Sequence, residues 1–177
     1  VLTSIEKITS QKGLGMASKR ITVSTAGIAK MIRQLGDDMV KFNLALSLHA
    51  ANDEKRSSIM PINESNSLRV LKLALQHYYY KTNNPVTFEY IIFKNFNDSL
   101  EDAAELARFC SYVPSKVNII EYNSIGDSVF EKSDDSRTIA FRNFLESKKN
   151  TAKIRRSRGK DIDAACGQLA NKNAAKN

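Results

Sequence analysis

The sequence predicts an α/β protein with a parallel sheet, because short apolar segments alternate with amphipathic segments four times along the chain. Most of the apolar segments are nearly continuous runs of aliphatic, β-branched and aromatic residues, which is typical of parallel strands covered by helices. Several of them end in small polar residues, and ligands of parallel α/β folds bind at the carboxyl ends of the strands. The alternation fits a barrel or a doubly wound sheet, and 177 residues suffice for one domain.

Five segments are predicted to be strands. The first four contain many β-branched or aromatic residues, whereas the fifth is a weaker candidate. In chain order they are residues 20–25, 42–50, 86–93, 116–123 and 151–157.

Four of the segments between these strands are predicted to be helices. The first covers residues 26–36, and Gly36 is predicted to be the residue just past its end. In the third, Asp98 or Ser99 is a candidate N-cap, and Cys110 lies on the apolar face, where we expect it to fill the core. The other two are predicted over residues 68–78 and 133–147.

Composition and cysteine usage exclude several classes of protein. No apolar stretch approaches the roughly 20 residues that a membrane span needs, and the first residues lack the layout of a signal peptide. The two cysteines, Cys110 and Cys166, are far apart and form no CxxC pair, so we expect neither a disulfide framework nor a zinc site. These features predict a reduced, cytoplasmic protein that is not bound to a membrane.

The positive charge is concentrated at the end of the chain. Residues 148–177 contain nine Lys or Arg and two Asp or Glu, so they carry nearly all of the formal net charge of +8. We therefore divide the chain into residues 1–147, the α/β part, and 148–177, a basic strand and segment. Such a patch attracts nucleic acid, but a solvated tail has the same composition, and charge alone does not decide between them.

Polar residues at the predicted strand ends are candidates for a ligand site. Ser24, Ser47, His49 and Asn123 close three of the strands, although Ser and Asn at such positions also serve as turn or cap residues. Because no second His lies near His49, we expect no metal site there. His49 is either a contact to a ligand or a structural histidine.

Cys166 lies just after the most cationic stretch of the chain, within the sequence DIDAACGQLA. Arg155, Arg156 and Arg158 would favour its thiolate form and hence its reactivity as a nucleophile, whereas Asp161 and Asp163 oppose that effect. A lone cysteine is also a common buried filler. From the residues alone, both interpretations stay open.

Five segments in a fixed order give the chain a resemblance to a known family. They are RITVSTAG, ALSLHAANDEKRSSIMPIN, VTFEYIIF, VNIIEYN and RGKDIDAACGQLA. Together they resemble the radical S-adenosylmethionine enzymes of the RlmN class, which methylate C2 of an adenine in 23S rRNA and in certain tRNAs. The resemblance extends from about the start of the chain to Ala170. It implies an α/β fold that is the C-terminal part of a partial TIM-type (β/α)6 barrel, followed by a basic C-terminal segment.

The resemblance also implies roles for individual residues. Those that match the positions that bind S-adenosylmethionine are Ser24, Ser47, Leu48, His49 and Asn123. Cys166 matches the catalytic cysteine, which receives a methyl group as an S-methylcysteine intermediate. In the family, a second molecule of the cofactor is cleaved at a 4Fe–4S cluster, and the radical that results activates this methyl group for transfer to adenine. A reductant protein supplies the electron, and the full-length enzyme is expected to be a monomer.

The cluster motif of the family, CxxxCxxC, does not occur in this chain, so the resemblance provides no metal ligand. We therefore expect the chain to be a C-terminal portion that is inactive by itself. Two alternatives remain. One is the related class of antibiotic-resistance enzymes, which methylate C8 of the same rRNA adenine. The other is a non-enzymatic RNA-binding module that uses the basic segment.

Overall fold

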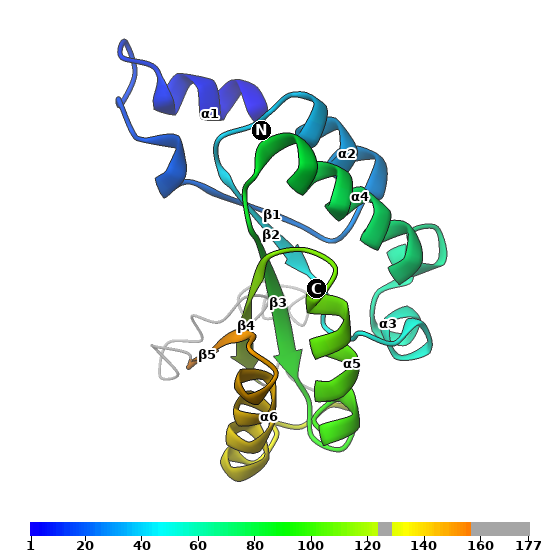
Figure 1. The fold of residues 1–177 in the computed structure, drawn as a ribbon. Coiled ribbons are helices and arrows are strands. Elements are labelled where there is room, and N and C mark those ends of the chain that lie inside the picture. Colours follow the sequence, from blue (N-terminus) through cyan, green and yellow to red (C-terminus); the bar gives the residue numbers. More distant parts are fainter. Residues whose placement is uncertain (124–128, 157–177) are drawn as a thin grey trace, which may run out of the picture.

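The computed structural model describes residues 1–123 and 129–156, and five strands form one sheet in this part of the chain (Figure 1). Each of the five predicted strand segments overlaps one of these strands, and neighbouring strands are all parallel, so the predicted α/β class is confirmed. The strands are β1 (Thr22–Thr25), β2 (Asn43–Ser47), β3 (Val86–Ile92), β4 (Ser115–Glu121) and β5 (Thr151–Arg155).

The connections between the strands are mostly helical. The four predicted helices are present, and the described residues form two more α-helices and two short 3₁₀ helices. The six α-helices are α1 (Leu2–Thr9), α2 (Ala29–Asp37), α3 (Asp53–Ile59), α4 (Leu68–Thr82), α5 (Leu100–Cys110) and α6 (Asp135–Ser147). The 3₁₀ helices are η1 (Ser18–Arg20) and η2 (Pro61–Glu64).

The strands lie in the sheet in chain order, β1-β2-β3-β4-β5. Because parallel crossovers are right-handed, connections that always advance in one direction place their helices on the same face of the sheet. Figure 1 shows α2, α4 and α5 together on one side of the strands. Within the described residues the order never reverses, as it would in a doubly wound sheet, and this favours the barrel-type arrangement. The six-stranded barrel itself stays a prediction.

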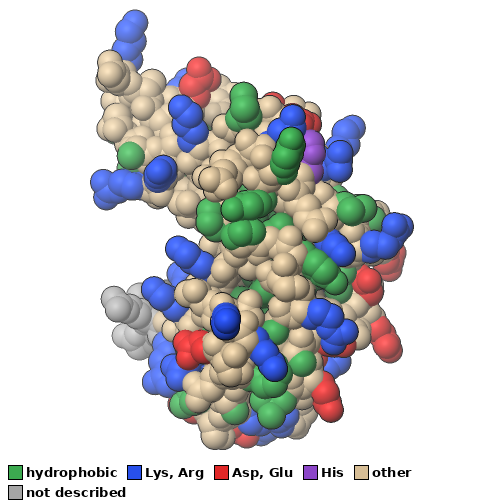
Figure 2. Space-filling model, in the orientation of Figure 1, with side chains coloured by type: hydrophobic (Ala, Val, Ile, Leu, Met, Phe, Trp, Pro, Cys, Tyr) green, Lys and Arg blue, Asp and Glu red, His purple; other side chains and the backbone are tan. Residues whose placement is uncertain are grey.

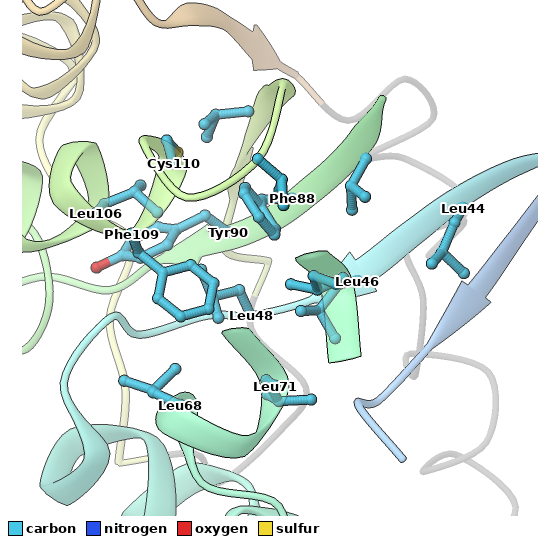
Figure 3. Close-up of a cluster of buried hydrophobic side chains, with 14 of the residues drawn as sticks. Leu44, Leu46, Leu48, Leu68, Leu71, Phe88, Tyr90, Leu106, Phe109 and Cys110 are labelled. Carbon is cyan, nitrogen blue, oxygen red and sulfur yellow. The ribbon is translucent and has the colours of Figure 1, made fainter. Parts of the chain in front are cut away.

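The hydrophobic core lies between the sheet and these helices (Figure 3). In β3 the buried residues alternate with partly exposed ones, so that Phe88 and Tyr90 point into the core beside Leu46 of β2. Cys110 packs in the same core and is 4% exposed, as predicted for a filler. The opposite face of the sheet is more polar, and the partly exposed Glu89 of β3 lies on it.

Gly36 does not end its helix, contrary to our prediction. It lies inside α2 and is buried, and Asp38 is the C-cap residue. A methyl group on Gly36 would lie 3.0 Å from Cα of Tyr78, in the neighbouring helix α4. The glycine is therefore needed for the close approach of two helices, and the chain leaves the helix through Met39, which has a positive φ of 46°.

The basic end of the chain begins inside the sheet. β5 pairs with β4 in parallel register from Lys116 opposite Thr151 to Ile120 opposite Arg155. The division of the chain at residue 147 stays a prediction, but the start of the second part continues the sheet of the first. No helix in the described part of the chain is both long and apolar enough to cross a membrane.

Candidate functional site

Two of the predicted cofactor-binding serines lie on the same face of neighbouring strands. Ser24 of β1 is the register partner of Ala45 in β2, and Ser47 follows Ala45 by two residues. Because side chains alternate along a strand, both serines point away from the buried Leu44 and Leu46. The structure therefore places both hydroxyl groups on the same face of the sheet, near the carboxyl ends of β1 and β2.

His49 stands just beyond the end of β2, where the backbone turns through a positive φ of 57°. Its Nδ1 accepts a hydrogen bond from the backbone N–H of Ile91, at 3.1 Å. Burial, together with the nearby charge of Arg56, lowers the pKa of His49 from 6.5 to about 4. The imidazole is therefore neutral at pH 7, and its proton is on Nε2, because Nδ1 is an acceptor. In this state His49 can donate a hydrogen bond to a ligand.

Leu48 lies between Ser47 and His49 in the chain, but its side chain points to the other face of the sheet. Its side chain is fully buried in the core, and its backbone N–H donates to the carbonyl of Glu89 at 3.0 Å. Its own carbonyl accepts from Nε of Arg56 at 3.2 Å. The contribution of Leu48 to the site is therefore the fixed backbone between Ser47 and His49.

Asn123 follows β4 by two residues and is partly buried. Its side-chain amide donates to the carbonyl of Glu121, at 3.3 Å. It lies beyond the carboxyl end of β4, which β3 separates from β2. Cys166, the predicted methyl carrier, lies outside the described residues.

A buried arginine joins the segment after β1 to the end of β2. Arg56, on α3, has no exposed surface, and its guanidinium donates to the carbonyl of Ala26 at 2.8 Å and to Oδ1 of Asn63 at 2.7 Å. It also donates to the carbonyls of Ser47 and Leu48, at 3.4 and 3.2 Å. Arg56 thereby ties the segment after β1 to the end of β2.

Gly27 allows this arrangement, because a methyl group there would lie 3.0 Å from the guanidinium and the residue has a φ of 105°. Sequence reasoning did not select Arg56. An arginine without exposed surface is unusual, but its burial is visible only in the fold.

Asn97 performs a similar task at the ends of β2 and β3. It is fully buried, and its Nδ2 donates to the carbonyls of His49 and Ile91, at 2.7 and 2.8 Å. Its Oδ1 accepts from the backbone N–H of Phe93 at 2.7 Å. The position of His49 is thus fixed through its own backbone carbonyl as well as through its ring. The sequence contained no signal for this role beyond a polar residue in a loop.

The residues at this end of the sheet can form hydrogen bonds with a polar ligand. Two serine hydroxyls, an asparagine amide and a neutral imidazole N–H are hydrogen-bonding groups for a ligand with hydroxyl, carboxylate and heterocyclic atoms. In the described part of the chain, no three His, Cys, Asp or Glu side chains are placed to hold a metal ion. Cys110 does not fit an iron–sulfur cluster, because it packs in the core and burial raises its pKa to about 12.

Comparisons with known proteins give a consistent result. A protein of Christiangramia forsetii named "Probable dual-specificity RNA methyltransferase RlmN" is 54% identical over 174 residues, which is 98% of this chain and 49% of that protein. A protein of the same name from Cytophaga hutchinsonii is 58% identical over 170 residues, 96% of this chain and 47% of that protein. This chain therefore spans about half the length of the curated relatives it matches. No family model matches the chain.

A solved structure extends the similarity to the fold. The crystal structure of a radical SAM methyltransferase from Sphaerobacter thermophilus superposes with a TM-score of 0.87 and 37% sequence identity. The superposition covers 91% of this chain and 47% of that protein. The resemblance noted in the sequence is therefore confirmed in both sequence and fold.

Proposed function

Because the chain corresponds in sequence and fold to about half of an RlmN-type radical S-adenosylmethionine methyltransferase, we propose that it is the C-terminal part of an enzyme that methylates C2 of an adenine in 23S rRNA and tRNA. The observation that carries this proposal is the placement of Ser24, Ser47 and His49 at the carboxyl ends of neighbouring strands. They are three of the five residues that the resemblance assigns to the cofactor, with Leu48 and Asn123 as the other two.

S-adenosylmethionine is the proposed cofactor, and when bound it supplies the methyl group and, together with a 4Fe–4S cluster, the radical that the reaction needs. Ser24, Ser47 and Asn123 would hold it through their polar side chains, and His49 through its Nε2–H. Leu48 would supply the rigid backbone between two of them. Cys110 is unsuited to the cluster, so we assign the cluster ligands to the portion of the protein that this chain does not span.

The RNA substrate would contact the basic end of the chain. Lys153, Arg155 and Arg156 lie on or next to β5 and are exposed, and they begin the segment that contains Cys166. Cations at such positions bind phosphates and orient a nucleic acid without reading its sequence. We propose that Cys166 carries the methyl group to an adenine held in this way, in a cytoplasmic, monomeric enzyme that a reductant protein supplies with electrons.

The test uses the full-length protein that contains this chain, with its cluster reconstituted without oxygen. We expect calorimetry to detect binding of S-adenosylmethionine, and mass spectrometry to find 2-methyladenine in 23S rRNA and tRNA after the reaction. An additional methyl group should be present on the peptide that contains Cys166, and Cys166→Ala should abolish methylation. Methylation at C8 would instead identify the antibiotic-resistance class. Salt-dependent RNA binding without binding of S-adenosylmethionine would identify an RNA-binding module.

A further inference from the structure

Glu89 lies in the centre of a row of polar side chains that crosses the open face of the sheet. The register places Ser47 of β2 opposite Glu89 of β3, Glu89 opposite Asn118 of β4, and Asn118 opposite Lys153 of β5. These residues alternate with the buried Phe88 and Tyr90, so Glu89 points away from the core. It is thus the direct neighbour of a serine assigned to the cofactor.

The carboxylate of Glu89 is held in one orientation. Its Oε1 accepts a hydrogen bond from Nδ2 of Asn118 at 2.9 Å and lies 3.8 Å from a guanidinium nitrogen of Arg155. The side chain is only 16% exposed, although it lies on the face of the sheet away from the core. An ionised carboxylate has about four acceptor positions, and these two contacts leave room for further hydrogen bonds from a ligand.

The charges around Glu89 limit the kind of group that it can bind. Arg155 already balances its charge, and Lys153 lies at the end of the same row. A sulfonium or an ammonium group that bound to Glu89 would be repelled by these two cations. A neutral hydrogen-bond donor would not be repelled. Neighbouring hydroxyl groups on a ribose form a pair of neutral donors that a carboxylate can accept together, as acidic residues do in dinucleotide-binding sites.

We propose that Glu89 is a cofactor-binding residue that accepts hydrogen bonds from the ribose hydroxyls of S-adenosylmethionine, with Asn118 as the residue that positions its carboxylate. This inference rests on the proposed function, because it takes the cofactor of that function as the ligand. It adds the middle of β3 to a site that the sequence located only at the ends of β1, β2 and β4.

The test measures binding to the full-length protein by calorimetry, with S-adenosylhomocysteine and two of its analogues as probes. One analogue lacks both ribose hydroxyls, and the other has inosine in place of adenosine. Glu89→Gln keeps the size of the side chain but removes its charge. We expect it to lower the affinity for S-adenosylhomocysteine about ten-fold or more. The analogue without ribose hydroxyls should bind more weakly than S-adenosylhomocysteine to the wild type, but almost as well as S-adenosylhomocysteine to Glu89→Gln. The reason is that the effects of removing two groups that contact each other are not additive.

Lys116→Gln is the matched control, since Lys116 is exposed on the same face of β4, two residues before Asn118. It should change affinity by less than about two-fold. Three outcomes would each overturn the ribose contact. The first is that Glu89→Gln binds S-adenosylhomocysteine as the wild type does. The second is that Glu89→Gln loses as much affinity for the analogue without hydroxyls as for S-adenosylhomocysteine, and the third is that its loss of affinity is non-additive with the change to inosine alone. A wild-type protein that binds none of the probes would overturn the proposed function together with this inference, whereas the other outcomes leave that function intact.

Discussion

Nδ1 of His49 accepts a hydrogen bond from the backbone N–H of Ile91, and this contact fixes which nitrogen of the imidazole carries the proton. The ring is joined to β3, while its backbone carbonyl is held by Asn97 at 2.7 Å. His49 therefore cannot act as a base through Nδ1 without losing the contact between β3 and the segment after β2. Its remaining function toward a ligand is that of a donor, through Nε2.

The first prediction concerns the effect of pH on stability. The pKa of His49 is about 4 in the folded protein and about 6.5 in the unfolded chain, so between these values the unfolded state binds more protons. The contribution of His49 to the free energy of unfolding is therefore complete above about pH 6.5 and decreases as the pH falls toward about 4. Urea unfolding of the full-length protein between pH 4 and 7.5 measures this slope.

His49→Asn is the matched variant for this experiment. Its side-chain carbonyl can accept from the N–H of Ile91, and Asn tolerates a positive φ such as the 57° found here. It does not titrate, so the difference in pH dependence between wild type and variant isolates His49. If the free energy of unfolding changed with pH in the same way in both proteins, folding would not lower the pKa of His49.

The second prediction concerns Arg56. Arg56→Met fills a similar volume but leaves the carbonyl of Ala26 and the Oδ1 of Asn63 without the donor that Arg56 supplies, whereas the carbonyl of Leu48 keeps the backbone N–H of Ala50 at 2.7 Å. We expect a loss of about 2–5 kcal/mol in the free energy of unfolding, because each buried acceptor left without a donor costs about 1–3 kcal/mol. Arg69→Met, at an exposed position on α4, should change it by less than about 0.5 kcal/mol. Chemical denaturation of both variants measures the difference, and equal effects would contradict the structural role of Arg56.

The sequence could predict the five strands and four of the helices, but not α1, α3 or the interactions that hold the site. The strands β3 and β4 were predictable because their segments are nearly continuous runs of aliphatic, β-branched and aromatic residues. The contacts of Arg56 with Ala26 and of Asn97 with His49 join residues 30 and 48 positions apart, and no local pattern encodes them. Glu89 was hidden for a related reason, because only the register of three strands reveals its polar neighbours.

Gly36 shows how one local pattern led to a wrong prediction. A glycine after an amphipathic segment often ends a helix, but here the helix continues and the glycine faces α4.

The third prediction follows from the contact between Gly36 and α4. Gly36→Ala should lower the free energy of unfolding by about 1–3 kcal/mol through overpacking against Tyr78, although Ala has the higher helix propensity. Lys30→Ala, at an exposed position of the same helix, should have almost no effect, and a stabilised Gly36→Ala variant would contradict the close packing of the two helices.

The last prediction separates the two cysteines. Cys110 is 4% exposed and burial raises its pKa to about 12, so almost none of it is thiolate at pH 8 and the thiolate is the reactive form. In the native full-length protein, iodoacetamide should therefore leave the peptide that contains Cys110 unmodified, and unfolding in urea should expose it to complete modification. Cys110→Ala removes only the sulfur from the core and should keep RNA methylation nearly intact, whereas Cys166→Ala should abolish it. Peptide mass spectrometry follows the modification, and the yield of methylated adenine follows the activity. The prediction would be wrong if Cys110 were modified rapidly in the native protein and if methylation were lost in Cys110→Ala but not in Cys166→Ala. Cys110 would then be the cysteine that carries the methyl group.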